Sequence, residues 1–422
     1  MPRWLYFMLI FAVLALLLAL LHAPAIPLFV AAGLGIVPLA ALIGQSVEQI
    51  AEHTGERIGG LLFATFGNAT ELIIGLFALS EGLVDVVRAS IIGSILGNAL
   101  LVLGVATCVG SFKHGRLHFE TRPASQYSSL LVLCIGGLML PTFAELLAAH
   151  NHQAQIFERD VLLSDFIAVL LLAGYFASIL FSVFRVGDKP VARDTEEFEP
   201  LVGARSSAAI ARLLAYRQHL SKSAAHGKTD VLRQIDTTLN AIFTHESGVH
   251  NSQPGETTTP QQPAQEEVKP NLWLALFLLT IATAGVAVLS EILVGTIEPL
   301  TKTLGWNASF VGLIFIPLIG GLPEYFNTIS MALDKRMEMV LAASAGSSIQ
   351  IALLIAPILV LASIFAPQRL DLVFSIIELA VLGLATFLFS EITRDGELVW
   401  LEGLLLILLY AMMGGTVFLF GA

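Results

Sequence analysis

Two glutamates in strongly apolar surroundings are the residues best suited to chemistry in this 422-residue chain. Glu71 ends the string Gly67-Asn68-Ala69-Thr70-Glu71, and Glu324 ends the string Gly320-Gly321-Leu322-Pro323-Glu324. A Gly-Ser pair follows each glutamate 22 residues later, Gly93-Ser94 and Gly346-Ser347, so one motif occurs twice. An acidic side chain at the centre of a membrane helix costs about 2.5 to 3.5 kcal/mol on translocon scales, which makes a functional role its default interpretation. The two carboxylates predict a site for cations or protons.

The two copies offer different oxygen ligands beside their carboxylates. Asn68 lies three residues before Glu71 and therefore on the same helical face, whereas Gly321 takes the place of this amide in the second copy. Pro323 lacks an amide hydrogen, and its ring clashes with the carbonyl of Ile319, four residues earlier. We expect this freed carbonyl to be a cation ligand, because irregular backbone at membrane depth lines a cavity or is covered by protein.

Further oxygen atoms come from the segments that follow the two motifs. Ser94 and Asn98 are four residues apart, and Ser347 and Gln350 are three apart, so each pair shares a helical face. Hard oxygen ligands suit Ca²⁺, which takes about six to eight of them, and the absence of sulfur and imidazole from the motifs argues against zinc or copper. The predicted cation- and proton-binding residues, with Glu71 and Glu324 as the metal ligands, are Glu71, Glu324, Asn68, Asn98, Ser94, Ser347, Gln350, Gly67, Gly320 and Ile319.

Some of these residues have a simpler interpretation in helix packing. Small and polar residues let membrane helices approach closely, and this alternative stays open for Ser94, Asn98 and Ser348. Packing gives no reason for two carboxylates at matching places. We expect close helix contacts at the glycines Gly93, Gly97, Gly104 and Gly346.

Two further features carry open interpretations. Glu291 lies one turn or more inside its apolar segment and acts either as a proton relay or gate or as an ordinary interhelical hydrogen-bond partner. Pro317 frees the carbonyl of Leu313 as Pro323 does that of Ile319, which makes it a second backbone candidate.

The composition requires apolar helices to carry these residues. Hydrophobic residues make up 56% of the chain, charged residues 13%, and the mean hydropathy is +0.80, which excludes an ordinary soluble globule. The net charge of −11 without a basic cluster argues against nucleic-acid binding. We predict an all-α integral membrane protein with eleven transmembrane helices of about 20 residues each, at 4–22, 25–44, 58–80, 84–110, 127–148, 162–184, 272–297, 306–332, 337–365, 372–391 and 398–421.

The distribution of basic residues predicts how the chain is oriented in the membrane. Cytoplasmic loops are rich in Lys and Arg, and the alternate loops that contain Arg3 hold more of them than the opposite loops do. We therefore place the N-terminus and the 185–271 segment in the cytoplasm and the C-terminus outside. A cleaved signal peptide is an alternative for the first apolar segment, although its apolar core exceeds the usual length. Cys108 and Cys134 lie in apolar segments and are interpreted as small packing residues.

A long polar segment divides the chain into two hydrophobic halves. We predict a first helix in 1–24, five helices in 25–184, a cytoplasmic loop in 185–271 and five helices in 272–422. The loop shows helical periodicity at 205–244 and opens with an acidic patch between Asp194 and Glu199. It is interpreted as a solvated linker, with a cation sensor or a lid as the alternative.

The position of the two motifs predicts inverted-topology repeats. Without the first helix, the motifs fall on the second and the seventh of ten helices. An odd offset means that the two copies cross the membrane in opposite directions, which is typical of inverted repeats with a substrate site at their midplane interface.

These motifs resemble those of the calcium/proton exchanger (CAX) family of the cation/calcium exchanger superfamily. The string from Gly67 to Ile74 is similar to its first signature repeat, and the string from Gly346 to Ala352 is similar to the end of its second. The resemblance implies eleven helices, one peripheral and two inverted sets of five, with Glu71 and Glu324 carrying cation and protons. The chain departs from the usual Gly-Asn-Ala-Ala-Glu-His of the second repeat.

The expected function is therefore secondary antiport of Ca²⁺ or a similar divalent cation against H⁺, without a cofactor and without enzymatic activity. A sodium-coupled cation/calcium exchanger or an Na⁺/H⁺ antiporter is the alternative within transport. No His-Glu-x-x-His string or paired nucleophile favours an intramembrane hydrolase, and a passive channel would not depend on a counter-gradient. The expected partners are the lipid bilayer and inorganic cations, the expected location is the cell (inner) membrane of a prokaryote, and a homo-oligomer stays an open alternative.

Overall fold

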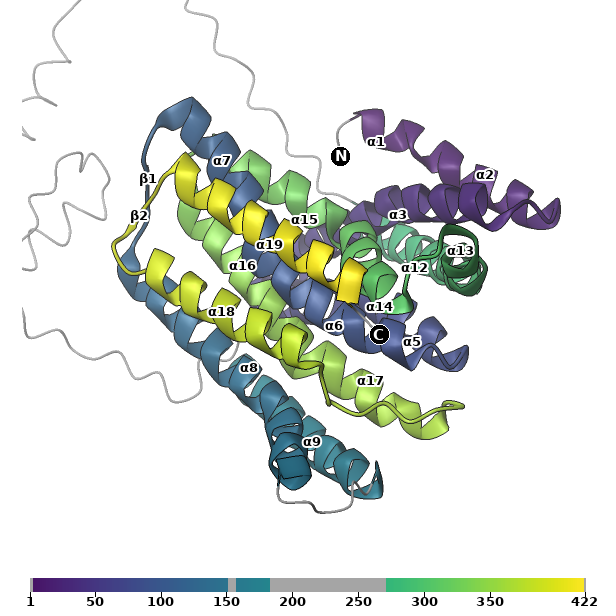
Figure 1. Ribbon diagram of the computed structural model, residues 1–422. Helices are drawn as coiled ribbons and strands as arrows, with labels where there is room; N and C mark the ends of the chain where they lie inside the picture. Colours follow the sequence, from purple (N-terminus) through teal and green to yellow (C-terminus); the bar gives the residue numbers. More distant parts are fainter. Residues whose placement is uncertain (1–2, 151–156, 183–270, 421–422) are drawn as a thin grey trace, which may run out of the picture. The chain divides into compact units, whose positions relative to one another are not determined.

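The structure is a computed structural model that describes residues 3–150, 157–182 and 271–420. The predicted helices of 205–244 and the acidic patch between Asp194 and Glu199 lie outside these residues. The described part is mostly helical (Figure 1). Each of the eleven predicted apolar segments is helical over most of its length. This confirms the helical membrane-protein class.

The elements follow one another along the chain as short and long helices with three π-helical segments (η1, η2, η3). In chain order they are α1 (Arg3–Phe7), α2 (Leu9–Leu20), α3 (Ala25–Thr54), α4 (Glu56–Phe66), α5 (Ala69–Ser80), α6 (Val84–Leu96), η1 (Gly97–Val102), α7 (Leu103–His114), β1 (Leu117–His118), α8 (Thr121–His150), α9 (Phe157–Ser182), α12 (Leu272–Gly295), α13 (Ile297–Leu304), α14 (Ala308–Phe310), η2 (Val311–Phe315), α15 (Ile316–Leu333), α16 (Met337–Gln350), η3 (Ile351–Ile355), α17 (Ala356–Ala362), the 3-10 turn η4 (Ser363–Phe365), α18 (Ile376–Ile392), β2 (Glu397–Leu398) and α19 (Trp400–Phe420).

Eight helical stretches of the described residues are long and apolar enough to cross a membrane. They are Ala25–Thr54, Val84–His114, Thr121–Ala148, Arg159–Leu180, Leu272–Leu304, Ala308–Leu333, Met337–Phe365 and Trp400–Phe420, and Leu5–Leu20 and Ala69–Ser80 are shorter apolar helices. Large apolar side chains such as Phe166 and Trp273 are exposed on their outer faces, as expected where lipid replaces water. The chain is thus a multi-pass membrane protein, while the count of eleven spans stays a prediction.

One small element departs from the all-α prediction. The two-residue strands β1 and β2 pair antiparallel, with Leu117 opposite Leu398 and His118 opposite Glu397. They join the segment after α7 to the segment before α19, and Arg116 adds an ion pair with Glu397 at 2.9 Å.

Prolines account for two of the three π-helical segments. Pro317 and Pro357 each follow a π segment after a single residue, η2 in the first case and η3 in the second. Because proline cannot donate a backbone hydrogen bond to the carbonyl four residues earlier, the chain widens there instead of continuing as a regular α-helix. π segments of this kind often lie at functional sites: η1 contains Asn98, and η3 begins directly after Gln350.

The first motif lies where one apolar segment breaks into two helices. α4 ends at Phe66 and α5 begins at Ala69, so Gly67 and Asn68 separate them. Glu71 consequently lies in the first turn of α5, where the helix dipole favours a negative charge. Glu324, in contrast, lies inside α15, which continues as a helix through Pro323. The backbone irregularity expected at the second motif therefore occurs as a break at the first.

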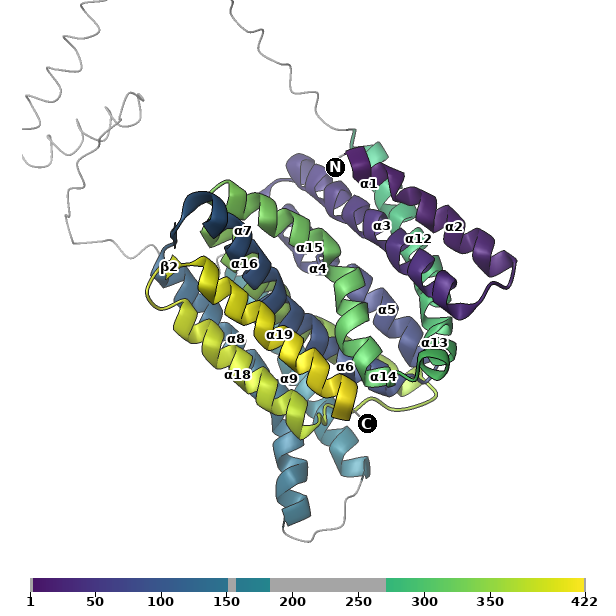
Figure 2. The same cartoon turned by 45° about the horizontal axis from the view of Figure 1, so that its top comes forward.

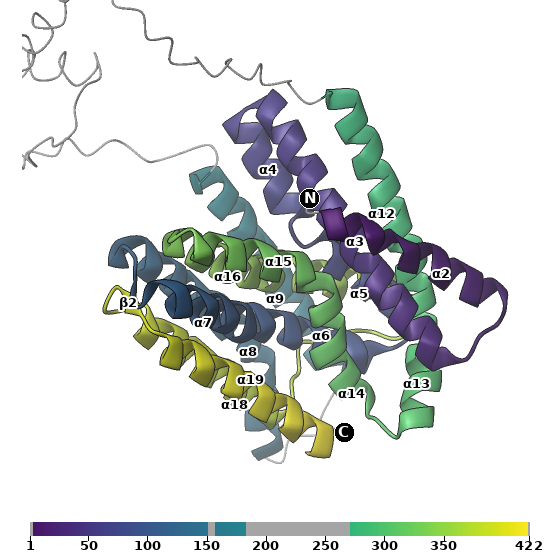
Figure 3. The same ribbon diagram turned by 90° about the horizontal axis from the view of Figure 1, so that it is seen from above.

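The N-terminal helix α2 packs against α3, and α1 contacts α2 (Figure 2). A Cβ atom added to Gly35 of α3 would lie 2.8 Å from the backbone of Ala12 in α2. α3 also makes the most extensive helix contact of the described residues, with α12 on its other side, as seen from above in Figure 3. α2 thus covers α3, a helix that also forms one wall of a cavity.

An extended segment of the second half is held between helices of the first half. Thr142 of α8 donates to the carbonyl of Leu372 over 3.3 Å and accepts from the Phe374 amide over 3.0 Å, and Ser164 of α9 accepts from the Leu372 amide over 2.9 Å. Its flanking charges form the ion pairs Arg369–Asp165 and Arg88–Asp371. These bonds satisfy backbone groups that would otherwise be buried without partners.

Candidate functional site

The two motifs meet at the glycines of the second copy. A Cβ atom added to Gly320 would lie 2.9 Å from Oε1 and 3.0 Å from Cδ of Glu71, and one added to Gly321 would lie 4.0 Å from Oε1. The Glu71 carboxylate therefore rests against the backbone of α15, one helical turn before Glu324. A larger side chain at Gly320 would displace the Glu71 carboxylate from this position, so Gly320 allows the close approach of Glu71, and its predicted role in cation binding stays a prediction.

Four polar side chains from both halves form a hydrogen-bonded chain at the same level. Asn98 donates to Ser347 Oγ over 3.0 Å, Ser347 donates to Asn68 Oδ1 over 2.6 Å, and Asn68 donates to Gln350 Oε1 over 2.8 Å. We call these four residues the amide network. It joins Asn68 before α5 and Asn98 in η1 to the end of α16. The sequence placed each of the four at the site, and the structure brings them together.

The side chain of Asn68 takes part in this network and does not cap its own helix. It occupies the N-cap position of α5, where an asparagine side chain usually accepts a hydrogen bond from the helix, yet its side chain makes no such bond. Its amide group is directed to Gln350 and Ser347 instead. A residue that satisfies an interhelical network at the expense of its own helix is typical of a functional site.

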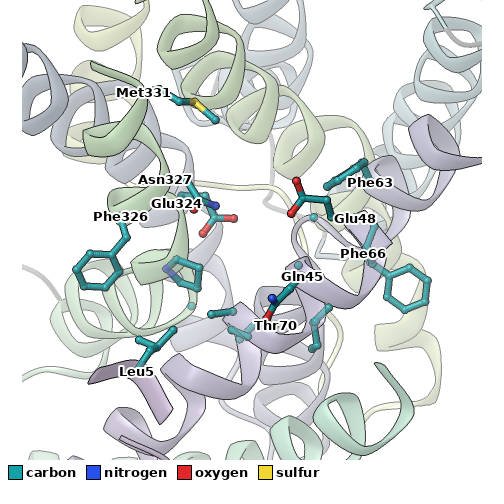
Figure 4. A pocket seen from close by; sticks show the side chains of 18 of the residues that line it. Leu5, Gln45, Glu48, Phe63, Phe66, Thr70, Glu324, Phe326, Asn327 and Met331 are labelled. Atoms are coloured by element: carbon teal, nitrogen blue, oxygen red, sulfur yellow. The ribbon is translucent and has the colours of Figure 1, made fainter. Parts of the chain in front are cut away.

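A cavity with a volume of about 610 Å³ leads to this region. Figure 4 shows its walls, with Gln45 and Glu48 of α3 and Phe63 and Phe66 of α4 facing α15 across the opening. Gly67, Thr70, Gly320, Pro323 and Glu324 form the inner end. Glu324 is partly exposed to the cavity, and its Oε2 atom is buried without a hydrogen-bond partner. Glu71, 9% exposed, lies behind Thr70 and Gly320 and does not line the cavity.

α6 and η2, whose residues do not line the cavity, are in backbone contact with each other. A Cβ atom added to Gly93 would collide with the carbonyl oxygen of Leu313, and one added to Gly312 would lie 2.5 Å from the carbonyl oxygen of Val86. The cavity thus approaches this pair of acidic side chains from the side where α3, α4 and α15 lie. Such a geometry can hold a small cation or protons and exchange them with that side.

A family sequence profile matches both halves of the chain. The sequence profile described as sodium/calcium exchanger protein matches residues 24–184 and 274–419. The chain belongs to the sodium/calcium exchanger protein family. Both matched ranges contain one of the two glutamate motifs, and the long polar segment between them lies outside the match.

Several relatives within the exchanger family are antiporters by name. The chain is 35% identical over 387 residues to a Ca(2+)/H(+) antiporter of Synechocystis sp., covering 91% of this chain and 89% of that protein. It is 31% identical over 401 residues to the Ca(2+)/H(+) antiporter ChaA of Bacillus subtilis, covering 95% and 94%. The resemblance to calcium/proton exchangers seen in the sequence is confirmed.

Solved exchanger structures share the fold. The structure of native YfkE superposes with a TM-score of 0.71 at 28% identity and covers 98% of this chain and 99% of that chain. The H+/Ca2+ exchanger CAX superposes with a TM-score of 0.61 at 14% identity, covering 99% of this chain and 92% of that chain, and this likeness concerns the fold alone.

Four of the residues predicted from the sequence do not join the amide network or the contact of Glu71 with α15. They are two predicted site residues, the predicted relay and a predicted backbone ligand. Ser94 is buried but forms no hydrogen bond with the amide network in the described residues. The side chain of Ile319 is buried and packs on Gly33 of α3, while the role of its carbonyl as a ligand stays a prediction. Glu291 is exposed on α12, so the structure does not place it with the two glutamates and its role as a relay stays a prediction. The carbonyl of Leu313 accepts a 3.5 Å hydrogen bond from Tyr410 and abuts Gly93, which makes it a packing group outside the cavity.

Helix packing at the four predicted glycines is unequal. Gly93 and Gly104 allow backbone contacts, with Leu313 and Gly403 respectively, and Gly97 makes only ordinary contacts. The prediction is wrong for Gly346, because nothing lies within 4 Å of a Cβ atom added there.

The sequence interpretation missed the acidic wall of the cavity. The apolar run predicts a second helix that ends at residue 44, whereas α3 continues to Thr54 and carries Glu48. Figure 4 shows Glu48 and Glu324 projecting from opposite walls. The spacing of Gln45 and Glu48, three residues apart on one helical face, was the signal that could have found them.

We expect Asn68→Ala to weaken cation binding. The substitution leaves the acceptor of Gln350 and the donor of Ser347 without their partner, and an orphaned buried group costs about 1 to 3 kcal/mol. The apparent calcium affinity of transport in membrane vesicles should fall about tenfold, since 1.4 kcal/mol corresponds to a factor of ten. Gln49→Ala, which removes an amide on α3 outside the cavity lining, is the control. An unchanged affinity in Asn68→Ala would exclude the amide network from binding.

Proposed function

We propose that this protein is a secondary active antiporter that exchanges Ca²⁺, or a similar divalent cation, for H⁺. The observation that carries the proposal is the meeting of Glu71 with the glycine motif that contains Glu324, in a chain whose relatives of similar length are named Ca(2+)/H(+) antiporters. The alignment with these relatives runs through both halves of the chain, so both carboxylates belong to the shared region.

The charges of the site suit this exchange. Two carboxylates hold either one divalent cation or two protons, and the site is neutral in both cases. Neutrality matters at membrane depth because an unpaired charge there is costly. Cation and protons therefore compete for the same oxygens, and one leaves as the other binds. The amide network supplies further hard oxygen atoms of the kind that Ca²⁺ prefers.

Access from one side supports an alternating mechanism. The cavity reaches Glu324 where α3, α15 and α16 approach the membrane surface, which is the cytoplasmic side in the predicted orientation. We infer that the contacts of Gly93 and Gly312 close the opposite side. In our proposal the two inverted five-helix repeats of an eleven-helix chain change their relative position so that the site opens to each side in turn. The N-terminus then lies in the cytoplasm, and the cell membrane of a prokaryote is the proposed location.

Sodium coupling is the second candidate, because the family profile is that of sodium/calcium exchangers. Gly321 stands where the first copy has Asn68, so the second copy lacks one neutral oxygen ligand. Sodium binding relies on such neutral oxygen ligands in addition to carboxylates. A site made mainly of two carboxylates therefore suits protons better than sodium. This favours the proton as the counter-ion.

The test imposes one gradient at a time on proteoliposomes that contain the full chain. We expect calcium uptake to follow an imposed pH gradient and to be insensitive to an imposed sodium gradient, with a pH-sensitive dye reporting proton movement in the opposite direction. Liposomes without protein are the control. Calcium uptake that follows sodium and leaves the pH unchanged would replace proton coupling by sodium coupling.

A further inference from the structure

Two of the three buried hydroxyl groups that have no partner in the described residues lie on one helix, α7, and the third, Ser290, lies on α12. Five buried side-chain atoms of the described residues have no hydrogen-bond partner, and three of them are Thr107 Oγ1, Ser111 Oγ and Glu324 Oε2. Thr107 is 0% and Ser111 5% exposed. A buried polar atom without a partner usually indicates a water molecule or an ion at that place.

These two hydroxyls behave unlike others in the same kind of helix. A threonine or serine in a helix commonly donates to the carbonyl four residues earlier, and this bond is made by Thr283, Thr386 and Thr416. Thr107 and Ser111 make no such bond although both lie within α7. Since lipid offers no hydrogen bonds, their partner must lie within the protein.

The direction of these hydroxyls follows from the neighbours of α7. A Cβ atom added to Gly110 would lie 3.0 Å from the Cβ of Ala332 in α15, and one added to Gly104 would lie 2.7 Å from the carbonyl oxygen of Gly403 in α19. Helical geometry places Thr107 and Ser111 on the face between these two contacts. Figures 2 and 3 show α7 between α15 and α19. We call this region the α7–α15–α19 junction.

The junction leads towards Glu324 at one end. α15 carries Thr328 one turn after Glu324, and its hydroxyl donates to the Glu324 carbonyl oxygen over 2.7 Å. Because Gly110 lies level with Ala332, Thr107 lies close to the level of Thr328. The hydroxyl of Thr328 is fully buried, and its oxygen can still accept a hydrogen bond.

A histidine lies at the other end of the junction. His114 follows Ser111 by three residues, and its Nε2 is 2.7 Å from the carbonyl oxygen of Leu333, the last residue of α15. Lys113 donates to the same carbonyl over 3.1 Å. Thr107, Ser111 and His114 are four and three residues apart and thus form one stripe along α7.

We propose that ordered water fills the α7–α15–α19 junction and carries protons between His114 and Glu324. Buried water needs about two to four polar partners, and the hydroxyls of Thr107, Ser111 and Thr328 provide them. Glu324 Oε2, which is buried without a partner in the described residues, is the end point of the proposed path. None of Thr107, Ser111 and His114 lines the cavity, whereas Glu324 does, so the proposed proton path meets the cation path only at Glu324. An arriving cation then does not block the departing protons. This inference rests on the proposed calcium/proton exchange.

The experiment measures two modes of transport by the full chain in proteoliposomes. The first is calcium-driven proton movement, followed with a pH-sensitive dye. The second is exchange of radioactive calcium for unlabelled calcium at equal pH on both sides, which requires the cation site but no net proton transfer. Thr107→Val and Ser111→Ala remove one hydroxyl each, and Thr107→Ser keeps it. Thr386→Val is the matched control, because Thr386 is buried but bonded to its own helix.

We expect Thr107→Val and Ser111→Ala to slow proton-coupled transport about tenfold and to leave calcium self-exchange unchanged. This is less than the roughly 10²- to 10⁴-fold contribution of a side chain that itself transfers the proton, because each hydroxyl only holds water in place. Thr107→Ser and Thr386→Val should keep both modes. Unchanged proton-coupled transport in both Thr107→Val and Ser111→Ala would overturn the proposed path. An equal loss of proton-coupled transport and calcium self-exchange would also overturn it, because such a loss indicates that the hydroxyls serve packing. Failure of the proposed function itself would be visible in the unsubstituted protein, as calcium transport without proton movement, and would overturn both.

Discussion

Glu71→Gln and Glu324→Gln are each expected to reduce calcium/proton exchange at least about a hundredfold, because two unit charges 4 Å apart interact by about 4 kcal/mol at an effective dielectric constant of 20. The substitution keeps the shape of the side chain and removes one charge. A divalent cation then leaves one positive charge uncompensated, and only one carboxylate remains to carry protons. The measurement is calcium-driven proton movement in proteoliposomes at saturating calcium.

The two glutamates differ in a way that a second substitution can test. Glu71 rests against Gly320 with little free space, whereas Glu324 faces the cavity. Glu324→Asp keeps the charge at the end of an open space and should retain part of the exchange. Glu71→Asp withdraws the carboxylate from its position against α15, so this variant should lose more of the calcium/proton exchange activity than Glu324→Asp.

Glu391→Gln is the control for both glutamates. Glu391 is an exposed acid near the end of α18, with Arg394 3.6 Å away, and it takes no part in the site. Normal exchange by either Glu71→Gln or Glu324→Gln would show that the two carboxylates are not shared by cation and protons.

The helical fold and the position of the two glutamates could be predicted because they depend on local signals. An apolar run of about 20 residues has few alternatives to a membrane helix, and an acid within such a run is conspicuous. The amide network could be proposed for the same reason, since Asn68, Asn98 and Gln350 are amides in apolar surroundings.

Other parts of the site depend on contacts between distant segments. The approach of Glu71 to Gly320 is a tertiary contact, and the sequence only shows a glycine at each motif. Pro323 suggested an irregular backbone, yet α15 continues through it and the break falls at Gly67 and Asn68. Gly93 and Gly346 look equivalent in the sequence, and only the former meets a neighbouring backbone. Identical residues thus acquire different roles through the helices that face them.

The difference between these two glycines predicts the largest effect on stability. In Gly93→Ala the new Cβ would collide with the Leu313 carbonyl oxygen and lie 2.7 Å from the carbonyl carbon and 2.8 Å from Cα. Backbone atoms cannot move aside as the end of a side chain can, so the cost should reach the upper part of the roughly 1 to 3 kcal/mol found for overpacking. Its thermal unfolding midpoint in detergent should fall by about 5 °C or more.

Gly346→Ala is the matched control, since Gly346 begins the corresponding Gly-Ser pair in α16 and has no atom within 4 Å of the new Cβ. Alanine stabilises a helix interior by about 0.5 to 1 kcal/mol relative to glycine, so its unfolding midpoint should stay the same or rise. Equal midpoints for the two alanine variants would contradict the close contact of α6 with η2. Because in our proposal this contact closes the side of the site opposite the cavity, Gly93→Ala protein that still folds should exchange calcium more slowly, whereas Gly346→Ala should exchange normally.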